Sequence, residues 1–309
     1  MKYKSFTEYK ALLRFALITI SIAFPALFAA QTIASAAVGP DDIEKKIQEL
    51  IRESGAETVG VAYLDLATGK EVLINADESF HAASTMKVAV MMEVFRQDRN
   101  GKLSLDDYIP IKNQFRSIAD GSLYSISAED DSDKTLYDRI GRTETVRELA
   151  RMMIDVSSNL ATNLLIERVT APSVMEFMRK IGAKNINVLR GVEDDKAYEL
   201  GMNNTTTARD LMIILSHIAR RQAVSSKASN EMVKILLDQK FNEGIPAGLP
   251  KEAKVAHKTG SITNINHDAA IVYPPNRKPY ILVVLTRGIE DEKRANKLIA
   301  DISRTLYKS

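Results

Sequence analysis

Ser84 and Lys87 lie three positions apart in the segment STMK, where strand-like sequence gives way to the helical pattern VAVMMEVFRQ. Residues three apart share one face of a helix, so the lysine amine can approach the serine hydroxyl and act as its base. A helix N-terminus favours an oxyanion over a cation, which lowers the pKa of a lysine placed there. The pair predicts a serine nucleophile, and a helix-capping serine with a surface lysine is the structural alternative. Ser84 is the only serine with a lysine three residues later.

Ser157 and Asn159 form a second candidate group in the segment SSN, which leads into the helical sequence LATNLLIE. A hydroxyl at Ser157 can relay a proton to a leaving nitrogen. The amide of Asn159 can hold both a substrate carbonyl and the Lys87 amine. Taken alone, the segment is equally typical of a polar helix cap.

The segment KTGS, residues 258–261, ends a strand-like run and supplies a third group. Lys258 and Thr259 on an edge strand can bind a substrate carboxylate, and Gly260 lets a substrate backbone come close. The backbone N–H of Ser261, with that of Ser84, can form an oxyanion hole. An ordinary strand-to-turn sequence is the alternative here.

The surrounding pattern predicts the elements that bring these three groups together. Strand-like runs occur at both ends of the chain, with a mainly helical sequence between them. We therefore expect an α/β (α+β) fold with a five-stranded antiparallel sheet built from both chain ends and flanked by helices, and an inserted helical part. The α/β part would span about residues 40–80 and 250–309, the helical part about 81–249, and the site would lie in the cleft between them. The helices expected in the middle cover residues 84–98, 143–156, 158–169, 172–181 and 207–221, with Thr143 and Thr207 as caps.

Residues 1–36 have the features of a signal peptide: a basic start, an apolar run and a small-residue ending, Ala34-Ser35-Ala36. The apolar run is short and contains Pro25, which disfavours a membrane span. We expect export to the periplasm or medium, without a stable membrane anchor after cleavage. Cleavage would change the formal charge from +2 to −1, because the leader holds four basic residues and one acidic residue. A near-neutral chain does not suggest a nucleic-acid partner. The chain has no cysteine, which excludes disulfides and thiol chemistry.

The three groups occur in the order typical of penicillin-recognising serine enzymes. Over nearly all of residues 37–309 the sequence resembles a class A β-lactamase, in phrases such as TVRELARMMIDVSSNLATNLLIE, NNTTTARDL and VAHKTGS. The resemblance implies that Ser84 is acylated and that Lys87 and Ser157 transfer protons. It implies substrate binding by four further residues: Asn159, Lys258, Thr259 and Ser261.

The sequence departs from this family in the loop that activates water. Class A enzymes carry Glu-x-x-Leu-Asn there, and this chain does not. Glu193 occupies the place expected for the catalytic glutamate, but Ala197 stands where the asparagine should be. Glu199 offers an alternative alignment, and a solvated acidic turn is the structural alternative for Glu193. The aspartate that usually pairs with Arg190 is Asn204, which permits at most a hydrogen bond.

Two further departures concern the second group and the stretch before it. Ser158 replaces the usual aspartate, and the longer connection between the first two groups contains the acidic segment 129–133, which we expect to be a solvated loop. The four histidines show no metal-ligand spacing, so we expect neither a metal nor another cofactor. His257 and His267 flank the third group and either line the site or occupy ordinary strand positions.

Three functions follow as hypotheses. The first is a serine β-lactamase in which Ser84 forms an acyl-enzyme and Glu193 assists the water that releases it. The second is a D-Ala-D-Ala peptidase acting on cell-wall peptide, which the missing asparagine favours. The third is a binding module without turnover, although a pure binder has no need of the complete set of reacting groups. We expect a small-molecule β-lactam or cell-wall peptide as the ligand, and a monomer.

Overall fold

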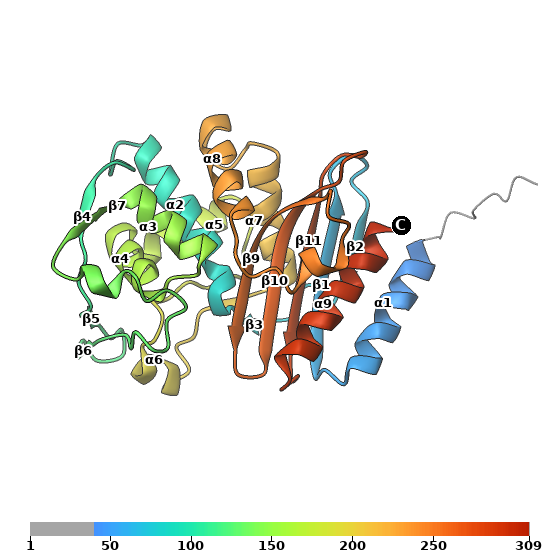
Figure 1. Ribbon diagram of the computed structural model, residues 1–309, viewed down its shortest axis with the longest axis horizontal. Coiled ribbons are helices and arrows are strands. Elements are labelled where there is room, and N and C mark those ends of the chain that lie inside the picture. Colours follow the sequence, from blue (N-terminus) through green and yellow to red (C-terminus); the bar gives the residue numbers. More distant parts are fainter. Residues whose placement is uncertain (1–39, 309) are drawn as a thin grey trace, which may run out of the picture. The chain divides into compact units, whose positions relative to one another are not determined.

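A five-stranded antiparallel sheet with the strand order β2-β1-β11-β10-β9 forms the centre of the computed structural model, which describes residues 40–308 (Figure 1). Strands from the two ends of the chain meet where β1 pairs with β11. The predicted fold class is confirmed. β9 is an edge strand, as the third group requires. The strands are β1 (Thr58–Asp65), β2 (Glu71–Ile74), β9 (Lys254–Ile262), β10 (Ile265–Tyr273) and β11 (Tyr280–Arg287).

Two helices cover one face of the sheet, α1 (Pro40–Ser54) and α9 (Glu292–Tyr307) (Figure 1). Their apolar residues recur at helical spacing and are buried against β1 and β11, as Ile47 and Ile302 illustrate. The first helix and the last helix therefore close one core.

The other face packs against the mainly helical part, which has α2 (Lys87–Arg99) at its centre. Most of α2 is buried, as expected for a helix surrounded by others. The segment η1 (Ala83–Met86), a 3₁₀ turn, leads into it. The remaining helices here are α3 (Val146–Asp155), α4 (Asn159–Val169), α5 (Ala171–Lys180), α6 (Asp195–Glu199), α7 (Ala208–Ala219) and α8 (Ser226–Leu237).

Three small two-stranded sheets, which the sequence did not predict, fix the loops of this part. They pair β3 (Phe80–His81) with β8 (Thr205–Thr206), β4 (Tyr108–Pro110) with β7 (Thr143–Thr145), and β5 (Phe115–Arg116) with β6 (Leu123–Tyr124). The β3–β8 pair joins the start of η1 to the segment that follows α6.

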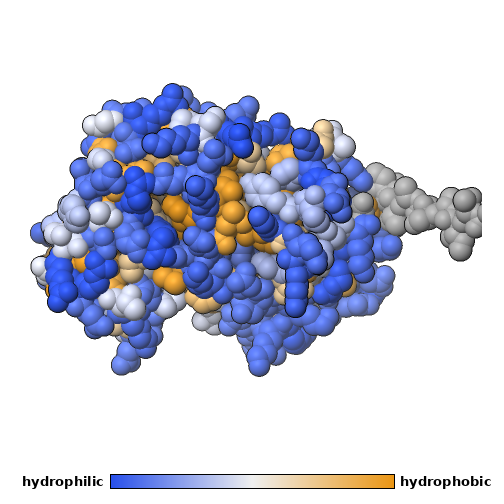
Figure 2. Space-filling model, turned by 45° about the horizontal axis from the view of Figure 1, so that its top comes forward, coloured by the Kyte–Doolittle hydropathy of each residue, from blue (hydrophilic) through white to orange (hydrophobic). Residues whose placement is uncertain are grey.

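Hydrophilic residues dominate the face drawn in Figure 2, with apolar residues gathered toward its middle. Within residues 40–308, no helix has the length and apolar character needed to cross a membrane. The predicted signal peptide, residues 1–36, lies outside the described residues.

Candidate active site

Ser84 lies in η1 and Lys87 is the first residue of α2, so both belong to one continuous helical segment. The Lys87 side chain is fully buried. Its Nζ donates to Ser157 O at 2.8 Å, Ser157 Oγ at 3.2 Å and Asn159 Oδ1 at 2.8 Å. The structure thus brings the first two predicted groups into direct contact.

Ser157 joins these residues to the third group. Lys258 Nζ donates to Ser157 Oγ at 3.0 Å and to Thr259 O at 2.8 Å. The Ser157 hydroxyl therefore lies between two buried lysine amines. Its backbone has φ 58°, in the left-handed region that a non-glycine residue rarely adopts. Ala83 and Glu193 also have positive φ, so three such residues surround one cleft, which is typical of functional sites.

Burial makes both lysines less basic. Desolvation lowers the pKa of Lys87 to about 7, against the opposing effect of the negative charges of Asp131 and Glu193. Desolvation also lowers the pKa of Lys258, and the nearby Lys87 lowers it further. A lysine that is neutral near physiological pH can accept a proton from a hydroxyl.

Gly260 allows β9 to pass close to the start of η1. A Cβ atom at this position would lie 3.0 Å from Ser84 N and 3.1 Å from Thr85 N. At contacts this short, a side chain would require the start of η1 to move by a few tenths of an ångström. Thr259, Gly260 and Ser261 line the cleft beside Ser84, and an oxyanion hole formed by the N–H groups of Ser84 and Ser261 stays a prediction.

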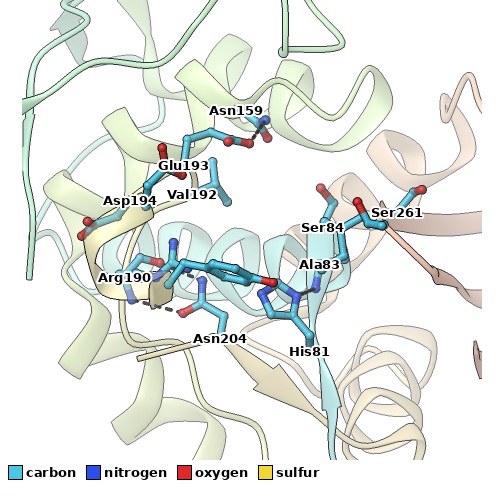
Figure 3. A pocket seen from close by; sticks show the side chains of 14 residues that line it. His81, Ala83, Ser84, Asn159, Arg190, Val192, Glu193, Asp194, Asn204 and Ser261 are labelled. Carbon is cyan, nitrogen blue, oxygen red and sulfur yellow. Dashed lines mark hydrogen bonds between the residues drawn. The ribbon is translucent and has the colours of Figure 1, made fainter. Parts of the chain in front are cut away.

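Two cavities of about 350 Å³ and 300 Å³ meet at this cleft, and four residues line both of them: Ser84, Asn159, Glu193 and Ser261. Figure 3 shows Glu193 and Asn159 across the cavity from Ser84 and Ser261. The nucleophile candidate and the candidate for water activation therefore face the same space.

Glu193 Oε1 accepts a hydrogen bond from Asn159 Nδ2 at 3.2 Å. Desolvation, followed by the charges of Asp195 and Asp130, raises the pKa of Glu193, and Lys87 opposes this change. A carboxylate of raised pKa is a stronger base than an ordinary one. Glu199, the alternative candidate, is exposed on α6 and does not line either cavity.

Ala197 is completely buried in α6 and offers no polar atom beyond its backbone. Arg190 and Asn204 form no ion pair, and the Asn204 side chain is hydrogen-bonded to the backbone of Arg190 instead of its guanidinium. Asn204 Oδ1 accepts a hydrogen bond from Arg190 N at 3.2 Å, and Asn204 Nδ2 donates a hydrogen bond to Arg190 O at 3.0 Å. The guanidinium of Arg190 donates to Met202 O, Gly191 O and the side chain of Asn203.

Asn163, which the sequence patterns did not single out, holds the Glu193 loop. Its side chain accepts from Val192 N at 2.7 Å and donates to Val192 O at 3.0 Å. Gly191 is required beside it, because a Cβ there would lie 2.3 Å from Asn163 Oδ1. The signal was present: Asn163 follows Asn159 by four residues, which places both on one face of α4.

The expectation that residues 129–133 form a solvated loop is wrong for two of its acids. Asp131 and Asp133 are only 4% and 6% exposed. Asp131 accepts hydrogen bonds from the backbone at the start of α4, and Asp133 from Thr135. Backbone donors, which composition does not reveal, compensate the burial of Asp131, whereas Asp133 Oδ2 is buried without a hydrogen-bond partner.

The histidines occupy separate places. His81 lines the 350 Å³ cavity, and His267 lines the 300 Å³ cavity, with its Nε2 2.9 Å from His81 O. Burial lowers the pKa of His267 to about 4, which keeps the ring neutral. His257 forms a buried pair with Asp268 at 2.9 Å, and His217 lies 3.2 Å from Ile181 O. Among residues 40–308, no cluster of three His, Asp or Glu residues has the arrangement of a metal site.

Comparisons with known proteins agree with this geometry. The family described as "Beta-lactamase enzyme family" matches residues 42–309. A β-lactamase of Bacillus licheniformis is 30% identical over 260 residues, which cover 81% of this chain and 78% of that protein. An ancestral class A β-lactamase structure has a TM-score of 0.74 and 27% identity, over 86% of this chain and 99% of that one. The structure of PBP-A has a TM-score of 0.73 and 25% identity, over 86% and 95%. The chain belongs to the β-lactamase enzyme family.

Proposed function

We propose that this protein is a class A-type serine β-lactamase that opens the lactam ring through an acyl-enzyme on Ser84. The observation that carries the proposal is the shared hydroxyl of Ser157, which Lys87 and Lys258 both contact beside Ser84. This arrangement connects a nucleophile, a base of lowered pKa and a route for a proton. The β-lactamase relatives support the same activity.

In acylation, neutral Lys87 accepts the Ser84 proton as Ser84 Oγ attacks the lactam carbonyl carbon. The C–N bond of the ring breaks, and a proton passes through the Ser157 hydroxyl to the departing nitrogen. Lys258 and Thr259 bind the substrate carboxylate, Asn159 binds its side-chain carbonyl, and the N–H groups of Ser84 and Ser261 stabilise the oxyanion. Gly260 lets the substrate approach β9.

In deacylation, Glu193 accepts a proton from water while the water oxygen attacks the ester carbonyl carbon. The bond to Ser84 Oγ breaks, and Ser84 regains a proton. The contact between Asn159 and Glu193 and the backbone contacts of Asn163 support this role, because they hold the carboxylate across the cavity from Ser84. No asparagine at position 197 assists it.

A time course with a chromogenic cephalosporin in excess, beside a Ser84→Ala control, tests the proposal. We expect many turnovers from the wild-type protein and none above background from the control. Absence of both turnover and a trapped acyl-enzyme on Ser84 would refute it and favour a binding module.

A D-Ala-D-Ala peptidase that β-lactams inhibit is the second candidate. The buried Ala197 favours it, because half of the expected water site is missing. The likeness to PBP-A is consistent with it. A burst of one equivalent that then stalls, together with release of D-alanine from a cell-wall peptide, would select this candidate over the first.

The cellular setting belongs to the same proposal. The leader-like sequence of residues 1–36 supports export, with cleavage before Ala37. Residues 37–309 would then form the catalytic unit, acting as a monomer in the periplasm or medium on β-lactams or cell-wall peptide, without a cofactor. Mass spectrometry of the secreted protein, to locate its first residue, and light scattering, to measure its mass, test these points.

A further inference from the structure

Asp131 makes more contacts with the second group than its place in an acidic loop suggests. Its carboxylate accepts from Asn159 N at 2.9 Å, from Leu160 N at 2.9 Å and from the Tyr137 hydroxyl at 2.9 Å. The side chain is 4% exposed. Two of these donors are free N–H groups in the first turn of α4, where a negative charge is stabilised by the helix dipole.

The same loop holds the turn that precedes α4. Ser132 Oγ lies 2.7 Å from Val156 O and 3.2 Å from Ser157 O. Ser158 caps α4 by accepting from Ala161 N, and it carries no charge. The carboxylate at the start of this helix therefore comes from a segment more than twenty residues earlier in the chain.

We propose that Asp131 is a positioning residue that fixes the Ser157-Ser158-Asn159 turn and supplies a negative charge facing Lys87. The inference deepens the proposed function and rests on it. It also accounts for two differences from the family together, the acidic segment 129–133 and the serine at position 158. The acidic segment supplies the carboxylate that position 158 lacks. Asp131 acts through Asn159 and Lys87, and it does not contact the reacting atoms.

The charged groups that act on Lys87 come from three different segments. The negative charges of Asp131, in the 129–133 loop, and of Glu193, in the loop before α6, both raise the pKa of Lys87. Lys258 of β9 donates a hydrogen bond to the same Ser157 hydroxyl, and repulsion by Lys87 lowers the pKa of Lys258. Of these two acids, Asp131 has the larger effect on the pKa of Lys87. Removal of its charge therefore lowers this pKa and makes Lys87 easier to deprotonate.

Asp131→Asn tests the proposal, with Asp133→Asn as the matched control from the same loop. Asp133 is equally buried but bonds to Thr135 instead of the α4 backbone. Two readouts are compared: NMR titration of Lys87 in protein labelled with [ε-¹³C]lysine, assigned with Lys87→Arg, and the pH profile of acylation by a chromogenic cephalosporin. The NMR titration does not depend on turnover.

In Asp131→Asn we expect two midpoints to fall by about half a pH unit or more: the midpoint of the Lys87 titration and the midpoint of the acid limb in the pH profile of acylation. We also expect the plateau rate to fall about tenfold, because one amide oxygen replaces two carboxylate oxygens. Asp133→Asn should leave both midpoints in place. Equal midpoints in Asp131→Asn and the wild type would overturn the proposal, even with a lower melting temperature.

If the Asp131→Asn variant does not fold, the Asp131→Glu variant tests the proposal instead. The charge is kept but displaced, so we expect Lys87 to titrate near its wild-type midpoint while acylation slows. An unchanged acylation rate would overturn the positioning role. If the wild type forms no acyl-enzyme while the Lys87 midpoint shifts in Asp131→Asn, the proposed function fails and the assignment of Asp131 stands.

Discussion

Lys87 determines the expected pH dependence of acylation. Only its neutral form accepts a proton, and burial lowers its pKa from 10.5 to about 7. Acylation should therefore be slow below this pH, rise with pH through about 7 and level off above it. Rapid-mixing measurements of the first turnover across this range test the prediction.

Lys87→Ala is the control for that profile. Loss of a general base costs about 10²–10⁴-fold in rate, and the limb near pH 7 should disappear with the amine. A residual limb at the same pH in Lys87→Ala would assign the titration to another group, with Glu193 the first to test, because it lines the same cavities as Ser84.

Glu193→Gln should separate the two chemical steps. The amide keeps the size of the side chain but does not accept a proton from water, so we expect acylation to persist while deacylation falls about 10²–10⁴-fold. Mass spectrometry should then detect an accumulated acyl-enzyme on Ser84. Glu199→Gln is the matched control, because Glu199 lies on the adjoining helix, lines neither cavity and should not affect turnover. Equal losses in both variants would contradict the assignment to Glu193.

Local spacing made some contacts predictable and not others. Ser84 and Lys87 belong to one helical turn, so their proximity follows from the helix repeat. Asp131 approaches Asn159 only after a loop folds back onto α4, and residues 129–133 alone look like a solvated acidic turn. The missed contact depends on two backbone N–H groups, which no side-chain pattern displays.

At the scale of elements, the contact between β9 and η1 limits what residue 260 can be. Gly260→Ala would push a Cβ to within about 3.0 Å of Ser84 N. The segment carrying the nucleophile should shift by a few tenths of an ångström, and acylation should fall about 10²-fold because misplaced reacting groups lose orientation. Acylation kinetics, with thermal melting to verify folding, test this. Acylation at the wild-type rate would mean that the contact has no catalytic consequence.

Helix ends illustrate how far element boundaries could be predicted. Thr207 caps α7, as the sequence suggested. The cap of α3 is Thr145 instead of Thr143, because residues 143–145 pair with β4 as a short strand before the helix begins. The partner strand lies more than thirty positions earlier in the chain, with Pro110 opposite Thr143 at one end and Tyr108 opposite Thr145 at the other. Helical periodicity carries no information about such a partner.

At the scale of the molecule, the sheet explains why the architecture could be predicted. Strand-like runs at both ends and a final helix with one apolar face have few ways to bury their apolar side chains, and one shared sheet is the simplest. The arrangement of loops around the cleft has no comparable constraint. Segments 129–133 and 190–194 are held by individual hydrogen bonds, such as that from Asn163 to Val192.

Because both chain ends build that sheet, a change in the last helix should weaken the whole fold without altering chemistry. Ile302 is completely buried between α9 and the sheet, on the face opposite the active site. Ile302→Ala should lower the free energy of unfolding by about 2–5 kcal/mol through lost burial and a cavity. Urea denaturation followed by far-UV circular dichroism should remain a single transition, with the turnover rate of the folded enzyme unchanged.

Lys297→Ala is the matched control on α9. The Lys297 side chain is 74% exposed and pairs with Asp301 at the surface, so the variant should change stability by less than about 1 kcal/mol. A second unfolding transition in Ile302→Ala would mean that the helical part stays folded when the sheet does not. In that case the sheet would not be a core that both parts of the fold share. Loss of turnover at the first transition would place the active site at the boundary between the sheet and the helical part.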